Sequence, residues 1–388
     1  MWYVKRVVRE MRKVSPVFPG VPVPVRWSDD GRAIQLLDQT LLPGEERYLR
    51  LETVEAVAEA ISSLRIRGAP AIGIAAALGL AMGTRRRFEG GGGTGGGDLE
   101  SGFRKDLDLL RGTRPTAVNL PWALDRLSRV FAETSPEGAE RQAQALAQEA
   151  DAIADEDREM CRLIGENGVE LIPEQGAGVL THCNAGALAT GGIGTALAPI
   201  YVAHARGIPI RLYADETRPL LQGARLTAWE ASTAGVATTV ITDSMACALM
   251  AEGRVNLVIV GADRVAANGD VANKIGTYGV AVLARHHGIP FYVALPRTTF
   301  DPGAAGGEEI PIEERNPSEL ERCGGGRVVP PGVSVLNRAF DVTPAHLVTA
   351  FITDGGILRP PFPEAIANLL GMGSAPTGSG DVFTEEQP

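Results

Sequence analysis

The sequence predicts an α/β protein, with a helix-covered parallel sheet in its C-terminal part and a smaller, mainly helical N-terminal part that bears a short β segment. From residue 176 onward, short apolar runs alternate with helical patterns, which is typical of a parallel sheet with helices on both faces. Between about residues 52 and 170, helical spacing of apolar residues dominates instead. A chain of 388 residues is long enough for two domains.

The N-terminal part is expected to begin with β structure over residues 25–52. Two runs that suit strands, 32–37 and 46–51, flank the turn signal Leu42-Pro-Gly-Glu45. Helical spacing follows over 52–62, where apolar residues recur on one face. The short β segment therefore comes before the helices.

Further helices are expected up to residue 170. Pro70 suits the first turn of an apolar helix that runs through Met82. Helical patterns resume from about residue 98, with breaks at Arg114-Pro115 and Ser135-Pro136. The stretch Gly90 to Gly97 is interpreted as a flexible surface loop, because no Lys-Ser or Lys-Thr pair follows it as in a phosphate loop.

The C-terminal part is expected to contain five strands separated by helices. The predicted strands are 176–181, 210–213, 238–241, 257–260 and 291–294, and the predicted helices are 194–206, 222–234, 243–252 and 273–287. We therefore place an N-terminal β/helical domain at 1–145 and a sheet-containing domain at 146–372. A flexible tail is expected at 373–388, which is rich in Gly, Ser, Pro and Glu.

Polar residues follow every predicted strand, and the carboxyl ends of parallel strands form the edge where ligands bind. Asp263 follows the most hydrophobic strand and does not directly precede a helix, so helix capping explains it poorly. Cys183 ends another strand just before a glycine-rich stretch, although free cysteines are commonly buried packing residues. Thr242 and Asp243 are predicted to cap the helix that follows them, and capping is an alternative interpretation of Asp215.

Composition argues against several classes of function. A net charge of −10 does not favour nucleic acid or an anionic membrane as a partner. The chain shows neither an apolar signal segment nor a run of about 20 apolar residues, so a cytoplasmic location is expected. The four cysteines lack metal-ligand spacing, which predicts no metal site. The glycine pattern Gly192-Ile-Gly194 is followed by Leu197 where a dinucleotide fingerprint has glycine, which disfavours a nicotinamide cofactor.

Eight segments, in order along most of the chain between about residues 25 and 360, resemble a known family. They are Arg67-Gly-Ala-Pro-Ala-Ile-Gly73, Arg114-Pro-Thr-Ala-Val-Asn-Leu120, Thr181-His-Cys-Asn-Ala-Gly186, Asp215-Glu-Thr-Arg-Pro-Leu-Leu-Gln-Gly-Ala-Arg-Leu226, Gly261-Ala-Asp-Arg264, Asn273-Lys-Ile-Gly-Thr277, Ile312-Glu-Glu-Arg315 and Thr353-Asp-Gly-Gly356. In these segments the chain resembles the methylthioribose-1-phosphate isomerases. That family is shared with non-catalytic regulatory subunits of the translation initiation factor exchange complex.

The resemblance implies a Rossmann-like catalytic domain, a homodimer and no cofactor. It implies the conversion of 5-methylthioribose 1-phosphate to 5-methylthioribulose 1-phosphate in methionine salvage. Cys183 and Asp263 match the catalytic positions of the family. The residues that match its substrate-binding positions are Arg67, Gly68, Ala69, Arg114, Gln222, Asn273 and Lys274.

These residue types suit the implied chemistry. Two arginines can neutralise a phosphate dianion, and a carboxylate and a thiol can move protons. Helix N-termini after Gly191-Gly192 and at Asn273 are expected to supply amide donors.

Two other interpretations stay open at this point. The first is an isomerase of a related sugar 1-phosphate, such as 5-deoxyribose 1-phosphate or ribose 1,5-bisphosphate, because the sequence does not indicate which residues contact the 5-substituent. The second is a regulatory subunit without activity, and the presence of Cys183, Asp263 and the two arginines argues against it.

Overall fold

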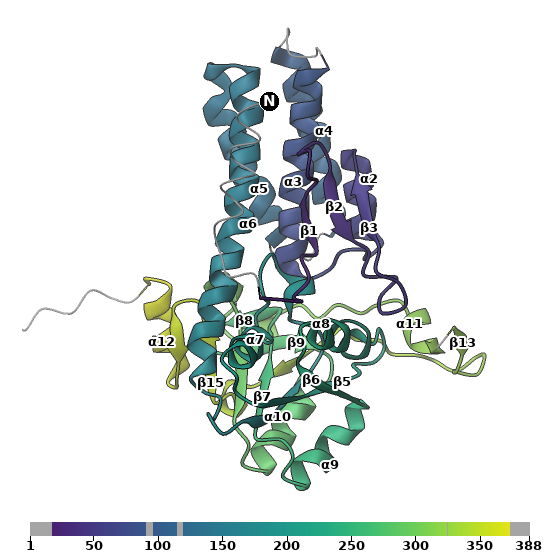
Figure 1. Ribbon diagram of the computed structural model, residues 1–388, viewed down its shortest axis with the longest axis vertical. Coiled ribbons are helices and arrows are strands. Elements are labelled where there is room, and N and C mark those ends of the chain that lie inside the picture. Colours follow the sequence, from purple (N-terminus) through teal and green to yellow (C-terminus); the bar gives the residue numbers. More distant parts are fainter. Residues whose placement is uncertain (1–17, 91–95, 115–118, 324, 373–388) are drawn as a thin grey trace, which may run out of the picture.

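The computed structural model describes residues 18–90, 96–114, 119–323 and 325–372. Long helices of the N-terminal part stand on the α/β body of the C-terminal part (Figure 1). The predicted tail at 373–388 and residues 91–95 of the predicted glycine loop lie outside the described residues. In the described ranges, no helix is long and apolar enough to cross a membrane.

The N-terminal part begins with a small antiparallel sheet, as expected, and continues as helices. Strand β1 pairs with β2, and β2 pairs with β3. The breaks at Arg114 and Ser135 separate helices as predicted. The elements of this part are β1 (Val25–Trp27), β2 (Ile34–Leu37), β3 (Tyr48–Leu51), α2 (Val54–Ser62), α3 (Ala69–Glu89), α4 (Gly96–Arg111), α5 (Asn119–Thr134) and α6 (Ala139–Val169).

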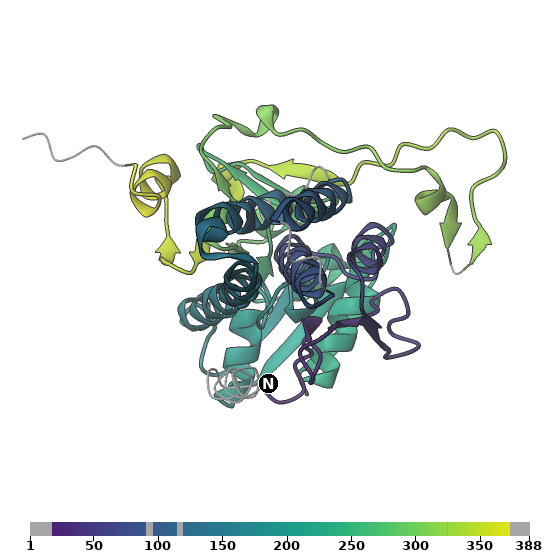
Figure 2. The same ribbon diagram turned by 90° about the horizontal axis from the view of Figure 1, so that it is seen from above.

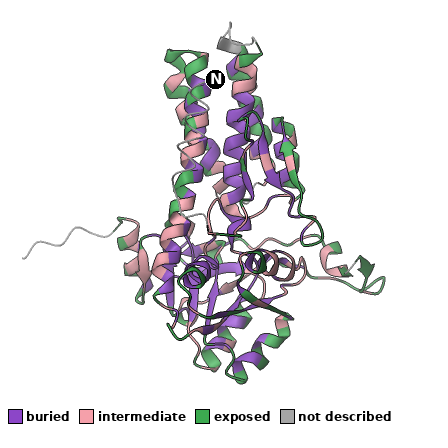
Figure 3. Cartoon of the chain, viewed as in Figure 1, coloured by how far each residue is buried: buried purple, intermediate pink, exposed green. Residues whose placement is uncertain are grey.

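Helix α3 is the centre of the N-terminal core. Every residue from Ala71 to Thr84 is buried, so the helix is covered on all sides (Figure 3). Its small residues let neighbouring helices approach closely: a Cβ added at Gly73 would lie 2.9 Å from the carbonyl oxygen of Asn119 in α5. The alanine- and glycine-rich sequence of α3 thus explains its position between other helices.

Helix α6 joins the two parts of the molecule. Its first half, up to Ala154, packs into the N-terminal hydrophobic core, and its second half, from Ile164, packs into a core beside the large sheet. The predicted domain boundary between residues 145 and 146 therefore falls inside one continuous helix, where neither a loop nor a shift in composition marks a division.

The body contains a large sheet, and seven of its strands lie in the described ranges. The order is β16-β15-β10-β7-β4-β5-β6, and all pairs are parallel except that between β15 and β16. The five predicted strands are present, and β15 and β16 are additional. The strands are β4 (Ala177–Thr181), β5 (Ile210–Asp215), β6 (Ala237–Ile241), β7 (Leu257–Val260), β10 (Phe291–Ala294), β15 (Ala350–Thr353) and β16 (Gly356–Leu358).

Helices cover both faces of this sheet, as the near-continuous apolar strands require. Successive residues of one strand face opposite cores: Val179 packs with helices α6 and α7, whereas Leu180 packs with α9 and α10. The helices of the body are α7 (Ala198–Ala205), α8 (Ala228–Thr233), α9 (Ala246–Ala251), α10 (Thr277–His286), α11 (Ser318–Glu321) and α12 (Phe362–Leu369).

A second, smaller sheet beside the body corrects one sequence prediction. Asn273 and Lys274 do not begin a helix; they end strand β9, and α10 starts only at Thr277, after Gly276 in the left-handed conformation. Strand β9 pairs with β14, about 70 residues further along the chain, and local periodicity cannot reveal such a partner. The strands of this sheet are β11 (Phe300–Asp301), β8 (Arg264–Ala266), β9 (Val271–Lys274) and β14 (Phe340–Thr343).

Between β11 and β14, the chain extends away from the body as a projecting segment (Figure 2). It carries α11 and a hairpin of two short strands, β12 (Arg322–Cys323) and β13 (Gly326–Arg327).

Candidate active site

The large sheet has a topological switch point between β4 and β7. After β4, the chain adds β5 and β6 on one side; after β7, it adds β10 and β15 on the other. Ligands of doubly wound sheets bind at the carboxyl ends of the strands at such a point. Cys183 follows β4 and Asp263 follows β7, so the two residues predicted to be catalytic flank the switch point although 80 positions separate them in the chain (263 − 183).

A cavity of about 910 Å³ opens at this point, and all nine predicted site residues line it. The body supplies Cys183, Gln222, Asp263, Asn273 and Lys274. Arg67, Gly68 and Ala69 come from the start of α3, and Arg114 follows α4. The cavity thus lies between the two parts of the molecule, and neither part forms it alone.

Cys183 has an unusual backbone. Its φ is 66°, in the left-handed region that a side chain with a Cβ rarely adopts, which costs on the order of 1 kcal/mol. Two hydrogen bonds hold it: its N–H donates to Thr217 Oγ1 at 2.8 Å, and its carbonyl accepts from Thr227 Oγ1 at 2.7 Å. Cys183 is only 9% exposed and lines the cavity. Surrounding hydroxyl groups therefore maintain a strained turn at this residue, which the sequence predicts to be catalytic.

Asp263 is exposed because it borders the cavity, and the cavity walls surround it with protein atoms. Protein atoms around the cavity desolvate its carboxyl group, and this burial raises its pKa above the ordinary value. The positive charges of Lys274, Arg67 and Arg114 act in the opposite direction and lower it. A carboxyl group that is more readily protonated than usual, beside cations, can both accept and return a proton.

Arg67 is oriented by a buried polar chain. Its Nη1 donates to Asn184 Oδ1 at 2.5 Å and its Nη2 to the Asn184 carbonyl at 3.0 Å. The Asn184 amide nitrogen in turn donates to Glu230 Oε1 at 2.5 Å. Burial raises the pKa of Glu230 to about 7, although hydrogen bonds from Leu188 and Asn184 partly oppose the rise.

Three cations at the cavity have no carboxylate partner among the described residues. Arg67 bonds to Asn184, and Lys274 Nζ donates to the carbonyl oxygen of Ala339 at 3.1 Å and lies 4.8 Å from the Phe340 ring centroid. Arg114 has neither a hydrogen bond nor an ion pair within the described ranges, and burial together with the nearby Arg315 and Arg67 lowers its pKa. Six arginine and lysine residues but only two carboxylates, Asp263 and Glu313, are among the described residues that line the cavity. This local excess of positive charge, in a chain of net charge −10, indicates an anionic ligand.

A helix N-terminus also faces the cavity, but it is not one of those expected. Helix α7 begins only at Ala198, and no helix begins at Asn273. Instead, the 21-residue helix α3 begins at Ala69, and Gly68 and Ala69 line the cavity. Gly68 has φ of +93°, and a Cβ there would lie 2.4 Å from the Ala189 carbonyl oxygen, so only glycine fits. The first amides of α3 are suited to an anion.

Two predicted binding residues present amide groups. Gln222 is 7% exposed, and its buried Oε1 has no hydrogen-bond partner in the described structure. Asn273 is 6% exposed and donates through Nδ2 to Thr277 Oγ1 at 3.1 Å. The unsatisfied acceptor of Gln222 could receive a ligand hydroxyl group.

Sequence reasoning missed several supporting residues. Asp243 was expected to cap its own helix, but its carboxylate accepts from the backbone N–H groups of Thr217 and Arg218, at 2.7 and 2.8 Å. Thr242 makes no capping bond either, and Asp215 pairs with His182. A short polar residue after a strand can cap a helix or hold a neighbouring loop, and the sequence signal is the same in both cases.

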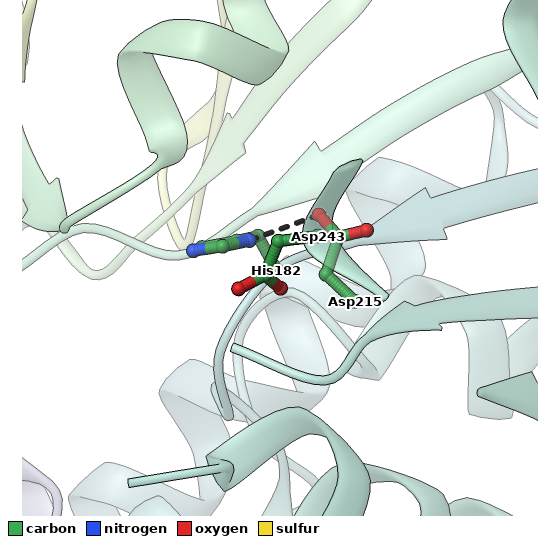
Figure 4. Close-up of side chains that lie close together, drawn as sticks. All are labelled: His182, Asp215 and Asp243. Carbon is green, nitrogen blue, oxygen red and sulfur yellow. Dashed lines mark hydrogen bonds and ion pairs between the residues drawn. The ribbon is translucent and has the colours of Figure 1, made fainter. Parts of the chain in front are cut away.

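One cluster has the composition of a metal site. His182, Asp215 and Asp243 each offer one possible ligand atom, and these three atoms lie within 4.8 Å of one another (Figure 4). Both ring nitrogens of His182 are already engaged, Nδ1 with Asp215 at 2.9 Å and Nε2 with the carbonyl oxygen of Ile275 at 2.8 Å. Asp243 is engaged by backbone amides. Among the possible donor atoms of these three side chains, only Asp215 Oδ1 lacks a hydrogen-bond partner in the described structure, so the cluster is a hydrogen-bond network rather than an open ligand set.

The sheet is doubly wound, and the cavity at its switch point is cationic and lined by a thiol and a carboxyl group. These features are typical of α/β proteins that bind an anionic small molecule. Residues 65–360 match the initiation factor 2 subunit family, and the chain belongs to that family.

Similar proteins narrow the class further. The chain is 53% identical to a 5-deoxyribose 1-phosphate isomerase of Moorella thermoacetica, covering 89% of this chain and 97% of the relative. It is 54% identical to a methylthioribose-1-phosphate isomerase of Heliobacterium modesticaldum, covering 88% and 97%. The crystal structure of the 5-methylthioribose 1-phosphate isomerase of Pyrococcus horikoshii OT3 matches with a TM-score of 0.88 at 44% identity, covering 93% and 99%. The resemblance predicted from the sequence is confirmed.

Proposed function

We propose that this protein is an aldose-ketose isomerase that converts 5-methylthioribose 1-phosphate to 5-methylthioribulose 1-phosphate in methionine salvage. The observation behind the proposal is the cavity at the switch point. It combines Cys183 and Asp263 with three cations that lack carboxylate partners. Relatives at more than half identity are named as isomerases of sugar 1-phosphates.

In this proposal, the phosphate binds at the N-terminal side of the cavity. Arg67 and Arg114 supply permanent charge, and the first amides of α3 at Gly68 and Ala69 supply donors. Lys274 reaches the same anion from β9. Gln222 and Asn273 bind sugar hydroxyl groups, which the free Oε1 of Gln222 supports.

The reaction balances without an added redox partner. Ring opening breaks the bond between C1 and the ring oxygen, which takes up a proton, while the phosphate stays on C1. One hydrogen then moves from C2 to C1, and the C2 hydroxyl loses its proton as the ketone forms. One proton is taken up and one is released, so the product is an isomer whether hydrogen moves as a proton or as a hydride.

Cys183 and Asp263 are the two groups placed to serve these steps. The raised pKa of Asp263 suits a carboxyl group that gives a proton to an oxygen and takes one back. Cys183 faces the same cavity from the neighbouring strand end, on the opposite side of the switch point. We assign both residues to proton transfer and leave phosphate binding to the cations.

A second candidate substrate is 5-deoxyribose 1-phosphate, because a relative at 53% identity is named for it. Its reaction at C1 and C2 is the same, and only the substituent at C5 differs. Ribose 1,5-bisphosphate would place a second anion at C5. A purely regulatory role is disfavoured, since it would not require a thiol and a carboxyl group beside unpaired cations.

The proposal includes a homodimer in the cytoplasm and no nucleic-acid partner. Free thiols at all four cysteines support the cytoplasmic location. The net charge of −10 disfavours a nucleic-acid partner. We also propose two functional domains that share α6, with the division at about residues 155–163, between its two core-packing halves.

A substrate panel tests the proposal. Ribose 1-phosphates with methylthio, hydrogen and phosphoryl groups at C5 would be compared by NMR of the product, in the presence of a chelator. The highest kcat/KM is expected for the methylthio sugar. A higher value for the deoxy or bisphosphate sugar would assign the alternative substrate, and no turnover of any of the three would refute the isomerase.

A further inference from the structure

His182 and Asp215 form a sealed pair directly behind Cys183. His182 is 1% exposed and Asp215 is 0% exposed, and Nδ1 lies 2.9 Å from Oδ2. The other ring nitrogen, Nε2, lies 2.8 Å from the carbonyl oxygen of Ile275. Figure 4 shows the ring directed at the Asp215 carboxylate.

The partners of the ring define where its hydrogens lie. A carbonyl oxygen only accepts, so Nε2 must carry a hydrogen. The bond between Nδ1 and Asp215 then needs a second hydrogen, held by either atom. In both arrangements the pair has no net charge and contains the same number of protons. Such a pair can orient its neighbours without altering the charge of the cavity.

The pair joins two walls of the cavity. His182 directly precedes Cys183, and Ile275 directly follows Asn273 and Lys274. Gly276 packs flat against the ring, because a Cβ there would lie 2.8 Å from its Cε1 atom. On the other side, Thr217 Oγ1 donates to the backbone carbonyl of Asp215 at 3.0 Å and accepts from the Cys183 N–H at 2.8 Å. The ring therefore lies between the strained turn at Cys183 and the end of β9.

We propose that His182 and Asp215 are positioning residues for the proposed isomerisation: through two hydrogen bonds, they hold the Cys183 turn in register with Asn273 and Lys274. This inference rests on the proposed function of the cavity. Direct acid-base action on the substrate is not assigned to the pair, because both ring nitrogens have protein partners and both side chains are sealed.

Asp215→Asn is the sharpest variant. An asparagine amide can donate to Nδ1 while Nε2 still donates to Ile275, so both hydrogen bonds survive without the shared proton. Asp215→Ala removes the hydrogen bond at Nδ1, and His182→Phe removes both hydrogen bonds of the ring. We expect Asp215→Asn to keep kcat within about threefold of the wild type. The other two should lose about 100-fold, because misplacing a reacting group by about 1 Å costs that much.

Two further readouts do not depend on turnover. The first is the rate at which iodoacetamide labels Cys183, measured by peptide mapping with exposed Cys247 and Cys323 as internal controls. It should change in Asp215→Ala and His182→Phe, and stay as in the wild type in Asp215→Asn. The second is nitrogen NMR of labelled histidine, where Asp215→Asn should show the tautomer protonated at Nε2 only.

The outcomes separate the two proposals. Loss of kcat in Asp215→Asn equal to that in Asp215→Ala would overturn the positioning role, since the proton rather than the geometry would then matter. Unchanged kcat and unchanged labelling of Cys183 in Asp215→Ala would also overturn it. If wild-type protein turns over no sugar phosphate, the proposed function fails, while the labelling and NMR results still decide whether the pair holds the Cys183 turn.

Discussion

The N-terminal helices and the C-terminal sheet contribute differently to one cavity. The N-terminal part supplies Arg67 and Arg114 and the start of α3, which are charges and amide donors. The sheet edge supplies Cys183 and Asp263, which can exchange protons. The proposed proton-transfer groups thus come from the body alone, whereas the proposed phosphate-binding groups come mainly from the N-terminal part. Variants of Cys183 and Asp263 should therefore reduce kcat, and variants of Arg67 and Arg114 should raise KM.

The largest effect is expected on the sheet side. Cys183→Ser and Asp263→Asn should each reduce kcat by about 10²–10⁴-fold, the range typical of positioned acid-base groups. Thermal melts should stay near those of the wild type, because both side chains border a cavity. Cys247→Ser, at an exposed thiol, is the matched control. A folded Cys183 or Asp263 variant with a normal rate would remove that residue from the chemistry.

On the helical side, Arg67→Ala and Arg114→Ala should weaken substrate binding by about 2–5 kcal/mol, which appears mainly in KM. Arg104→Ala serves as the control, since that exposed arginine pairs only with Glu100 on the surface of α4. Inhibition constants for a sugar-phosphate analogue would separate binding from turnover. Equal inhibition of the wild type and both cavity variants would contradict a role in phosphate binding.

Glu230, which belongs to the buried polar chain behind Arg67, should make the stability of the protein depend on pH. Its pKa is about 7 in the fold, above the ordinary glutamate value of 4.5, so folding favours the protonated form. Its contribution to stability is therefore complete below about pH 4.5 and is lost as pH rises through about 7. Glu230→Gln should remove this loss, which amounts to about 3 kcal/mol at about 1.4 kcal/mol per pKa unit.

Urea denaturation of both proteins at pH 5.5 and pH 8.5 measures this difference. The wild type should lose more free energy of unfolding than Glu230→Gln between the two values. If the wild type instead gains free energy of unfolding relative to Glu230→Gln between pH 5.5 and pH 8.5, ionisation of Glu230 does not destabilise the fold and the raised pKa is contradicted.

Gly68→Ala tests how closely the two regions must approach. The added Cβ would meet the backbone of Ala189 at a φ that disfavours alanine. We expect about 1–3 kcal/mol less stability and a raised KM, since strained positions cost about that much. Gly112→Ala is a milder control, because its Cβ would meet only ordinary contacts at 3.5 Å and beyond. Similar melting temperatures for both variants would argue against close packing at Gly68.

The smallest effect is expected from metal removal. Both ring nitrogens of His182 and both carboxylate oxygens of Asp243 already form hydrogen bonds with protein groups, so exhaustive chelation should leave kcat/KM unchanged. Rates before and after dialysis against a chelator, with zinc and magnesium added back, measure this. If chelation lowers the rate and one added metal restores it, the cluster would have to be considered as a metal site.

Much of the fold could be predicted because its signals are local. Each parallel strand is a short apolar run, and the breaks at Arg114 and Ser135 contain proline. The hairpin of β8 and β9 is not among the predicted strands, although Asn268-Gly269 is a turn signal. Strand β9 was interpreted as the start of a helix, since its partner β14 is distant in the chain.

The sequence by itself determined the alternation of strands and helices, and hence a sheet edge with polar residues. The motif resemblance pointed to Cys183, Asp263 and the cations. Only the tertiary structure decided that β4 and β7 are neighbours, that α3 begins at the cavity, that Asp215 pairs with His182, and that Asp243 holds the backbone at Thr217 rather than capping its helix. The physical reason is range: helix and strand patterns arise within a few residues, whereas a site depends on contacts between residues far apart in the chain.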